Sequence, residues 1–329
     1  MKMKNSKKSG TSRRQRAATT TIPNIQTILA TTDFSDESRS GVSYAVALGK
    51  QLGATVALLH VIEPPSRLSG TESIVFARKD SEVVAFARKK LATLAKREGK
   101  GDATPTSSIR TGKPFHEINT AARESTADLI VIATHGYTGA KRVLLGSTAE
   151  RVVRHAPCSV LTVPTQITQE RAGKTPTLKV KKILVPMDFS NLSKDALPWA
   201  TFLAAQFKAE VVLLHVVEKF PIDYLMGREL TSHTIVPLMK QAETNLERAT
   251  TDLAKAFDLK MSAVVRAGKP YAEICEAAKV LEADLIVLTT HGYTGLKHVW
   301  LGSTAERVVR HALCPVLVVR AKNPGAGDK

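Results

Sequence analysis

The chain contains one internal repeat, and this repeat constrains the fold more than any other feature of its 329 residues. The segment 129–163, LIVIATHGYTGAKRVLLGSTAERVVRHAPCSVLTV, recurs at 285–319 as LIVLTTHGYTGLKHVWLGSTAERVVRHALCPVLVV, with 27 of 35 positions identical. The earlier segments 36–62 and 191–217 share only 10 of 27 positions. A repeating unit of about 140 residues has the length of a whole domain. We therefore expect two copies of one domain in tandem.

The repeat and the polar stretches around it set the expected domain boundaries. We place the first domain at 23–164 and the second at 179–321, joined by a polar linker at 165–178 that contains glycine and proline. A basic tail at 1–22 precedes them, and a short tail at 322–329 follows.

Within the first repeat, short apolar runs alternate with helical patterns. Alternation of this kind favours β-α-β units, a parallel doubly wound sheet and right-handed crossovers, which is an α/β fold with helices on both faces. In such sheets, ligands bind beyond the carboxyl ends of the strands, where the strand order reverses. The runs are TILATT, TVALLHV, SSIR, DLIVIAT and SVLTV, and the helices are expected near 36–52, 77–98, 115–126 and 147–155.

Composition excludes several classes of protein. With 43% hydrophobic and 23% charged residues the chain has globular composition. No uncharged apolar run reaches the roughly 18 residues of a membrane span, and the basic start lacks the apolar core of a signal peptide. The cysteines Cys158, Cys275 and Cys314 are too few and too scattered for a disulfide framework or a metal site, and each is expected to act as a small core residue. We expect a soluble, cytoplasmic protein.

The net charge of +17 is concentrated at the N-terminus, where residues 1–20 contain seven lysines and arginines and no carboxylate. A basic, serine- and threonine-rich tail without aromatic residues is expected to be disordered. It would bind nucleic acid by counterion release, or it would only keep the chain in solution, and we favour the second interpretation.

Each repeat places a carboxylate directly after its first expected strand. Asp33 follows that strand in the first repeat, and Asp188 follows it in the second. At this edge of a parallel sheet, a carboxylate can accept hydrogen bonds from ribose hydroxyls. The alternative is that each aspartate caps the helix that follows it.

The fourth strand of each repeat leads into a glycine-containing loop and then a helix. Gly136 lies ten residues before Gly146, and Ser147 follows; Lys141 lies in the basic loop between them. Glycines allow close approach of backbone to phosphate oxygens, and the start of a helix favours negative charge. The alternative is a capping box formed by Ser147 and Glu150, which needs no ligand. The second repeat has the same pattern at Gly292, Lys297, Gly302, Ser303 and Glu306.

Histidines near these strand ends are interpreted as structural residues or as contacts, not as catalytic bases. His60 and His215 end the second strands and are expected to be satisfied at the edge of the core. The backbone beside them, at Val61 and Val216, can meet the edge of a purine. Two further histidines, His135 and His291, precede the loop glycines and are possible phosphate contacts.

Standard catalytic motifs are absent from the sequence. It has no GxxxxGK[ST] phosphate loop, no GxGxxG after the first strand, no HExxH and no GxSxG. No His, Cys and carboxylate residues occur at the spacing of a metal site, so we expect neither a catalytic centre nor a bound structural metal.

At these residues the chain resembles the universal stress protein family in its tandem two-domain form. The nucleotide-binding members carry Gly-x-x-Gly, nine residues, and then Gly followed by Ser or Thr. This pattern matches Gly136, Gly146 and Ser147 in the first repeat and Gly292, Gly302 and Ser303 in the second, except that the first glycine is replaced by Ala133 and Thr289.

The resemblance implies a five-stranded parallel sheet in the order 3-2-1-4-5 in each repeat, with ATP across the ends of strands 1 and 4 and with domains that pair through their last strands. It implies an ATP-binding stress-response regulator that is not an enzyme beyond slow ATP hydrolysis, with Mg as a candidate companion of ATP. Oligomeric state stays open between a monomer and a homodimer.

A nucleotide-free interaction protein, in which the paired repeats dock a partner, is the second hypothesis. Because Thr289 is β-branched and adds bulk beside the expected ribose, we expect the first site to bind ATP at least as well as the second. The expected nucleotide-binding residues are Asp33, Val61, Ala133, His135, Gly136, Gly146, Ser147, Thr148, Asp188, Val216, Thr289, His291, Gly292, Gly302, Ser303 and Thr304.

Overall fold

The computed structural model describes residues 23–64, 71–99, 104–134, 145–165, 178–218, 232–289 and 301–320. The expected tails and most of the expected linker lie outside these ranges, as do His135, Gly136, Lys141, His291, Gly292 and Lys297.

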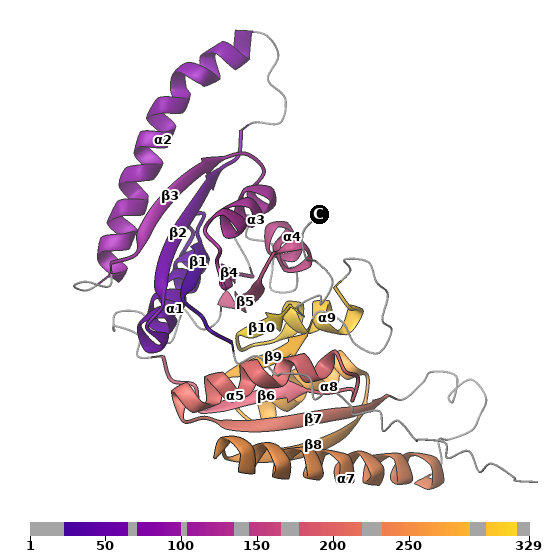
Figure 1. Ribbon diagram of the computed structural model, residues 1–329. Helices are drawn as coiled ribbons and strands as arrows, with labels where there is room; N and C mark the ends of the chain where they lie inside the picture. Colours follow the sequence, from indigo (N-terminus) through magenta and orange to yellow (C-terminus); the bar gives the residue numbers. More distant parts are fainter. Residues whose placement is uncertain are drawn as a thin grey trace, which may run out of the picture.

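The first repeat alternates strands and helices along the whole of its length (Figure 1). Its elements are β1 (Thr27–Thr31), α1 (Asp36–Leu52), β2 (Thr55–Ile62), α2 (Thr71–Glu98), β3 (Thr106–Thr111), α3 (Pro114–Glu124), β4 (Leu129–Ala133), α4 (Ser147–His155) and β5 (Ser159–Val163).

The second repeat follows the same order, with one difference at the start of its first helix. A short 3-10 turn, η3 (Ser193–Asp195), precedes α5 (Ala196–Phe207). Pro198 accounts for the late start, because proline is tolerated only in the first turn of an α-helix. The other elements are β6 (Lys182–Pro186), β7 (Glu210–Glu218), α7 (Ser232–Phe257), β8 (Met261–Gly268), α8 (Pro270–Val280), β9 (Leu285–Thr289), α9 (Ser303–His311) and β10 (Val316–Val319).

All ten strands form one sheet in the order β3-β2-β1-β4-β5-β10-β9-β6-β7-β8. Within each repeat the strands are parallel and follow the order 3-2-1-4-5, so the expected fold class is confirmed. The repeats meet at the antiparallel pair of β5 and β10, with Leu161 opposite Leu317. Figure 1 shows the repeats as two halves joined at these strands, with α2 and α7 along the outer edges.

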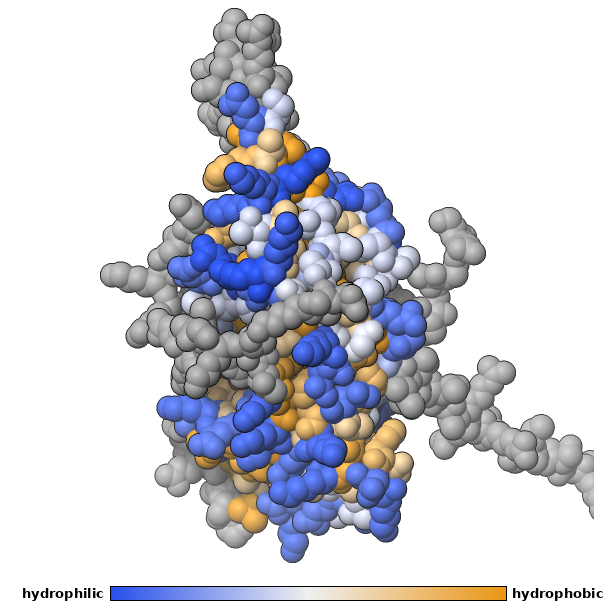
Figure 2. Space-filling view, turned by 90° about the vertical axis from the view of Figure 1, so that its left-hand side faces the viewer, coloured by the Kyte–Doolittle hydropathy of each residue, from blue (hydrophilic) through white to orange (hydrophobic). Residues whose placement is uncertain are grey.

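The inner strands, such as β4 and β5, are buried on both faces and are almost continuously apolar, whereas the edge strands β3 and β8 are more exposed. Alternate residues of a strand point to opposite faces: Ile28 and Ala30 belong to a core cluster that includes residues of α1, α2, α5 and α7, whereas Leu29 belongs to a second cluster with residues of α3, α4, α8 and α9. We call these the α1 face and the α4 face. On the side of the molecule seen in Figure 2, hydrophilic residues predominate and apolar residues show between them.

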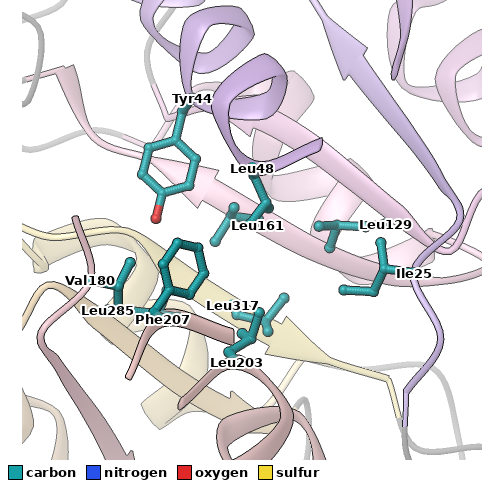
Figure 3. Close-up of a pocket in the computed structure, with 10 residues that line it drawn as sticks. All are labelled: Ile25, Tyr44, Leu48, Leu129, Leu161, Val180, Leu203, Phe207, Leu285 and Leu317. Atoms are coloured by element: carbon teal, nitrogen blue, oxygen red, sulfur yellow. The ribbon is translucent and has the colours of Figure 1, made fainter. Parts of the chain in front are cut away.

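A small cavity lies at the junction of the repeats on the α1 face. Its volume is about 10 Å³, and Figure 3 shows side chains of both repeats around it, including Tyr44 and Phe207. This volume is close to the minimum for one water molecule, so the cavity is too small for an organic ligand. None of the helices in the described part of the chain has the length and apolar character that crossing a membrane requires.

Candidate functional site

The strand order reverses between β1 and β4 in the first repeat and between β6 and β9 in the second. From β1 the chain crosses over to β2 on one side, and β4 and β5 lie on the other side. At such a switch point the loops diverge and leave a crevice beyond the carboxyl ends of the strands. Each repeat therefore has one such switch point, which we call the crevice of that repeat, and the expected site residues that the structure describes lie beside it.

Asp33 lies at the first crevice, exposed at the end of β1, with its carboxylate oriented by the start of α1. Its Oδ1 accepts hydrogen bonds from the backbone N–H of Ser35 at 3.0 Å and from the Ser35 hydroxyl at 2.5 Å. The alternative role as a helix cap is wrong for Asp33, because Ser35 is the capping residue and accepts from the N–H of Ser38 at 3.1 Å.

The second repeat builds a similar turn after its first strand. Asp188 Oδ1 accepts from the N–H of Ser190 at 3.0 Å, and Ser190 in turn accepts from the N–H of Ser193 at 3.0 Å. Asp188 therefore does not cap the helix either.

The first repeat has two additional bonds in this turn. The Thr32 hydroxyl accepts from the N–H of Phe34 at 3.0 Å, and Arg39 donates to the Phe34 carbonyl at 3.1 Å. Met187 stands in place of Thr32 in the second repeat and has no hydroxyl to offer.

The backbone of Val61 faces the crevice past the end of β1. The Leu59 carbonyl accepts from the N–H of Thr32, so Leu59 directs its backbone groups toward β1. Residues two apart in a strand direct their backbone groups to the same side, and Val61 lies beyond the last pair of β1 with β2. Val216 has the same position, since the Leu214 carbonyl accepts from the N–H of Met187. Both backbones therefore lie at the strand ends beside the switch points.

Ala133 and Thr289 end the fourth strands with ordinary negative φ, so the backbone does not require glycine there. Strand alternation puts both side chains on the α1 face, and a Cβ on Gly41 of α1 would lie 3.7 Å from the Ala133 Cβ. The bulk of Thr289 is thus directed to the side of α5, away from the start of α9.

Gly146 brings the start of α4 against the end of β4. Its N–H donates to the Thr134 carbonyl at 2.7 Å, and a Cβ added to Gly146 would lie 3.2 Å from that oxygen. The close approach favours glycine here, whereas its φ of −57° does not demand one. It therefore seats the first turn of α4 at the edge of the crevice.

The start of α4 is open among the described residues. Gly146 is the N-cap and no side chain caps the helix, so the expected capping box of Ser147 and Glu150 is wrong. Ser147 is the first helical residue and is exposed, and Thr148 is half-buried beside it. The first N–H groups of a helix have no partner within the helix and attract anions. Gly302, Ser303 and Thr304 repeat this arrangement in α9, where Gly302 is the N-cap.

Glu150 and Glu306 do not fold back on their own helix starts because they pair across the repeats. Arg154 lies 2.9 Å from Glu150 and 2.8 Å from Glu306, and Arg310 lies 3.1 Å from Glu306 and 3.8 Å from Glu150. We call these four residues the cross-repeat charge cluster. It links α4 to α9, the two helices that begin at the two crevices.

Phe34 and Phe189, which the sequence reasoning did not single out, lie at the crevices in an unusual conformation. Each follows the aspartate and has a left-handed backbone, with φ of 67° and 62°. Their repetition in the less similar halves of the repeats was the only sequence signal, since the conformation itself depends on tertiary contacts.

His60 and His215 are satisfied at the edge of the core, as expected. Nδ1 of His60 donates to the Thr32 carbonyl at 2.8 Å, and Nδ1 of His215 donates to the Met187 carbonyl at 2.7 Å. Burial lowers the pKa of His60 below its ordinary value, against the opposing effects of the Thr32 carbonyl and of Asp33. His60 is therefore a neutral hydrogen-bond donor at neutral pH.

The cysteines are free and unreactive in character. Burial raises the pKa of Cys158 to about 12, of Cys275 to about 11 and of Cys314 to about 12. Thiols that stay protonated are poor nucleophiles and poor metal ligands. Within the described ranges, no three His, Cys, Asp or Glu residues come together in a group able to hold a metal ion.

A doubly wound α/β sheet with a polar turn and a helix start at each switch point belongs to the class of α/β proteins whose candidate sites lie at the strand ends. The comparisons specify the class further. Residues 24–164 and 179–320 both match the universal stress protein family, and the chain belongs to this family.

Some relatives match over about one repeat and others over more of the chain. Universal stress protein MJ0531 of Methanocaldococcus jannaschii is 39% identical over 140 residues, which is 43% of this chain and 82% of the relative. A solved universal stress protein from Archaeoglobus fulgidus matches both repeats, with a TM-score of 0.62, 21% identity and coverage of 89% of this chain and 98% of that one. A universal stress protein solved in complex with cAMP matches 43% of this chain and 99% of its own, at 25% identity and a TM-score of 0.33.

Proposed function

We propose that each crevice binds an adenine nucleotide, ATP in the first instance, and that the protein acts in the stress response as a nucleotide-dependent regulator. The observation that carries this proposal is the pairing of an oriented carboxylate at the end of β1 with an open helix start at the end of β4, repeated in both halves of the chain.

Each group has a role suited to its chemistry. The carboxylates of Asp33 and Asp188 accept from ribose hydroxyls, and the backbones of Val61 and Val216 meet the purine. The N–H groups at the starts of α4 and α9 hold the phosphates, because backbone donors and the helix dipole both favour negative charge there. The residues His135, Gly136, His291 and Gly292 belong to the proposal as phosphate contacts, although they lie outside the described residues.

We propose that the aspartate turn of the first site is more ordered before the ligand binds than that of the second site. In the turn of the first site, Thr32 and Arg39 both bond to Phe34, whereas the matching residues of the second repeat are Met187, which has no hydroxyl, and Lys194, which bonds to Asn191. A turn that is ordered before binding loses less entropy when the ligand arrives. This supports the expectation that the first site binds ATP at least as well as the second.

We propose that the chain is a binding protein and not an enzyme with fast turnover. Rapid phosphoryl transfer needs a positioned base or water-orienting group and a cationic side chain on the transferring phosphate, and our proposal assigns neither. Mg would accompany ATP through the phosphate oxygens. The β5–β10 ladder supports internal pairing of the repeats, with a monomer and a homodimer as the two alternatives, and a cytoplasmic location completes the proposal.

Proline at the first helical position tests the phosphate site with little risk to the fold. Ser147→Pro and Ser303→Pro remove one N–H donor from each helix start, and the chain already places Pro114 and Pro270 at this position of α3 and α8. Gly146 has φ −57° and ψ 137°, a conformation that a following proline favours. Stability should therefore be kept.

The measurement is calorimetric titration of the full chain with ATP. The proline pair should weaken binding tenfold or more, whereas the control pair Ser147→Ala and Ser303→Ala keeps both N–H groups and should weaken it less. Equal affinity of the proline and alanine pairs would contradict the phosphate site. A wild-type chain that binds no nucleotide would favour the nucleotide-free interaction protein.

A further inference from the structure

The two phenylalanines beside the aspartates adopt a backbone that their residue type avoids. Positive φ is common for glycine but rare for a residue with a large side chain, so the surroundings must hold Phe34 and Phe189 in place. The contact is specific. The Phe34 ring lies 4.2 Å from the His60 ring, centroid to centroid, with an angle of 34° between the planes.

One histidine side chain thus contacts the residues on both sides of the aspartate. Nδ1 of His60 donates to the Thr32 carbonyl, which precedes Asp33, and the ring packs on Phe34, which follows it. A loop fixed at both neighbours leaves the carboxylate little freedom. The contacts come from β2, a strand inside the sheet, and not from the loop itself.

The second repeat reaches the same geometry from a different local sequence. His215 donates to the Met187 carbonyl, and its ring lies 4.5 Å from the Phe189 ring at an angle of 35°. Met187 replaces Thr32, and a 3-10 turn replaces the first turn of α1. The arrangement is therefore not a by-product of one particular loop sequence.

We propose that His60 and His215 are positioning residues that set the ribose selectivity of the two nucleotide sites. Each acts through its neighbouring aspartate: the histidine fixes the residues on both sides, and the fixed carboxylate distinguishes a nucleotide with ribose hydroxyls from one without them. This inference rests on the proposed function. It adds the determinant of ligand selectivity and assigns it to side chains that do not touch the ligand.

The test compares ATP with 2′,3′-dideoxy-ATP, which keeps the base and the phosphates. The wild-type chain should bind ATP about tenfold more tightly, the effect of a hydrogen bond to a charged group. In the paired variant His60→Ala and His215→Ala this ratio should fall toward one, while the affinity for dideoxy-ATP stays unchanged. The control pair His116→Ala and His311→Ala removes two exposed histidines away from the crevices and should keep the wild-type ratio.

If the alanine pair does not fold, a second pair of variants tests the same inference. Phe34→Asn and Phe189→Asn remove the rings, and asparagine tolerates a left-handed backbone. These variants keep the histidine-to-carbonyl bond and should lower the ratio partially, by about threefold.

The outcomes separate this inference from the proposed function. Absence of ATP binding by the wild-type chain would defeat both. Wild-type selectivity that persists in the alanine or asparagine pairs, or an equal loss of ATP and dideoxy-ATP affinity, would overturn the positioning role and leave nucleotide binding intact.

Discussion

The guanidinium of Arg154 in the first repeat lies 2.8 Å from the carboxylate of Glu306 in the second. Both side chains are about three-quarters buried, with exposures of 24% and 23%, so solvent screens the pair less than a surface pair. Their helices, α4 and α9, begin at the two proposed nucleotide sites. The charge cluster is therefore a direct link between the two halves of the molecule.

This link predicts an energetic coupling across the repeats. In a double-mutant cycle of Arg154→Met and Glu306→Gln, we expect a coupling of about 1 kcal/mol in the free energy of unfolding, reduced by high salt. Urea unfolding of the four proteins measures it. The exposed pair of Arg39 and Asp36, 2.7 Å apart within α1, is the matched control and should give a smaller value. Additive effects at the cross-repeat pair would show that the contact contributes nothing.

The substitution Gly146→Ala should weaken ATP binding and leave the stability of the fold nearly unchanged. The new methyl would lie 3.2 Å from the Thr134 carbonyl, so the start of α4 must shift by a few tenths of an ångström. The loss of unfolded-state entropy offsets much of the strain, and we expect the free energy of unfolding to change by less than about 1 kcal/mol. Affinity for ATP at the first site should fall. An unchanged affinity would mean that the position of this helix start does not matter for the ligand.

The lowered pKa of His60 predicts that the free energy of unfolding falls in acid. Because burial lowers its folded pKa, the unfolded chain takes up a proton first as the pH falls below about 6.5. The contribution of His60 to stability is complete above that pH and is lost as the pH falls toward the folded pKa. Unfolding measured from pH 8 to 5 should show this decline, and His60→Asn should reduce the slope. His116→Asn, at an exposed histidine, serves as the control; an identical slope in both variants would argue against the assignment.

The cysteines should resist alkylation in the folded protein. With pKa values of about 12, 11 and 12, Cys158, Cys275 and Cys314 carry almost no thiolate at pH 8. Iodoacetamide followed by mass spectrometry should label them far more slowly in the native chain than in urea. Rapid labelling of any of the three under native conditions would contradict their burial.

Much of the fold is predictable from the sequence, since apolar runs bounded by polar residues specify buried parallel strands. The expected helices at 36–52 and 147–155 coincide with α1 and α4. The helix expected near 77 begins instead at Thr71, where β-branched Thr71, Ile74 and Val75 weaken the local helical signal.

The site was less predictable, because its geometry depends on tertiary contacts. Ser147 and Glu150 have the spacing of a capping box, but Gly146 becomes the N-cap, and Glu150 pairs with Arg154 and Arg310. No apolar or polar periodicity indicates that Phe34 adopts positive φ, and its ring packs on His60, which comes from the neighbouring strand.

The most direct test of the account is to identify what the purified chain carries. Heat release followed by mass spectrometry of the full-length protein should yield an adenine nucleotide, and titration of the emptied chain with ATP should give up to two sites, the first at least as tight as the second. A chain that releases no nucleotide and binds ATP no more tightly than about 1 mM would contradict the central claim.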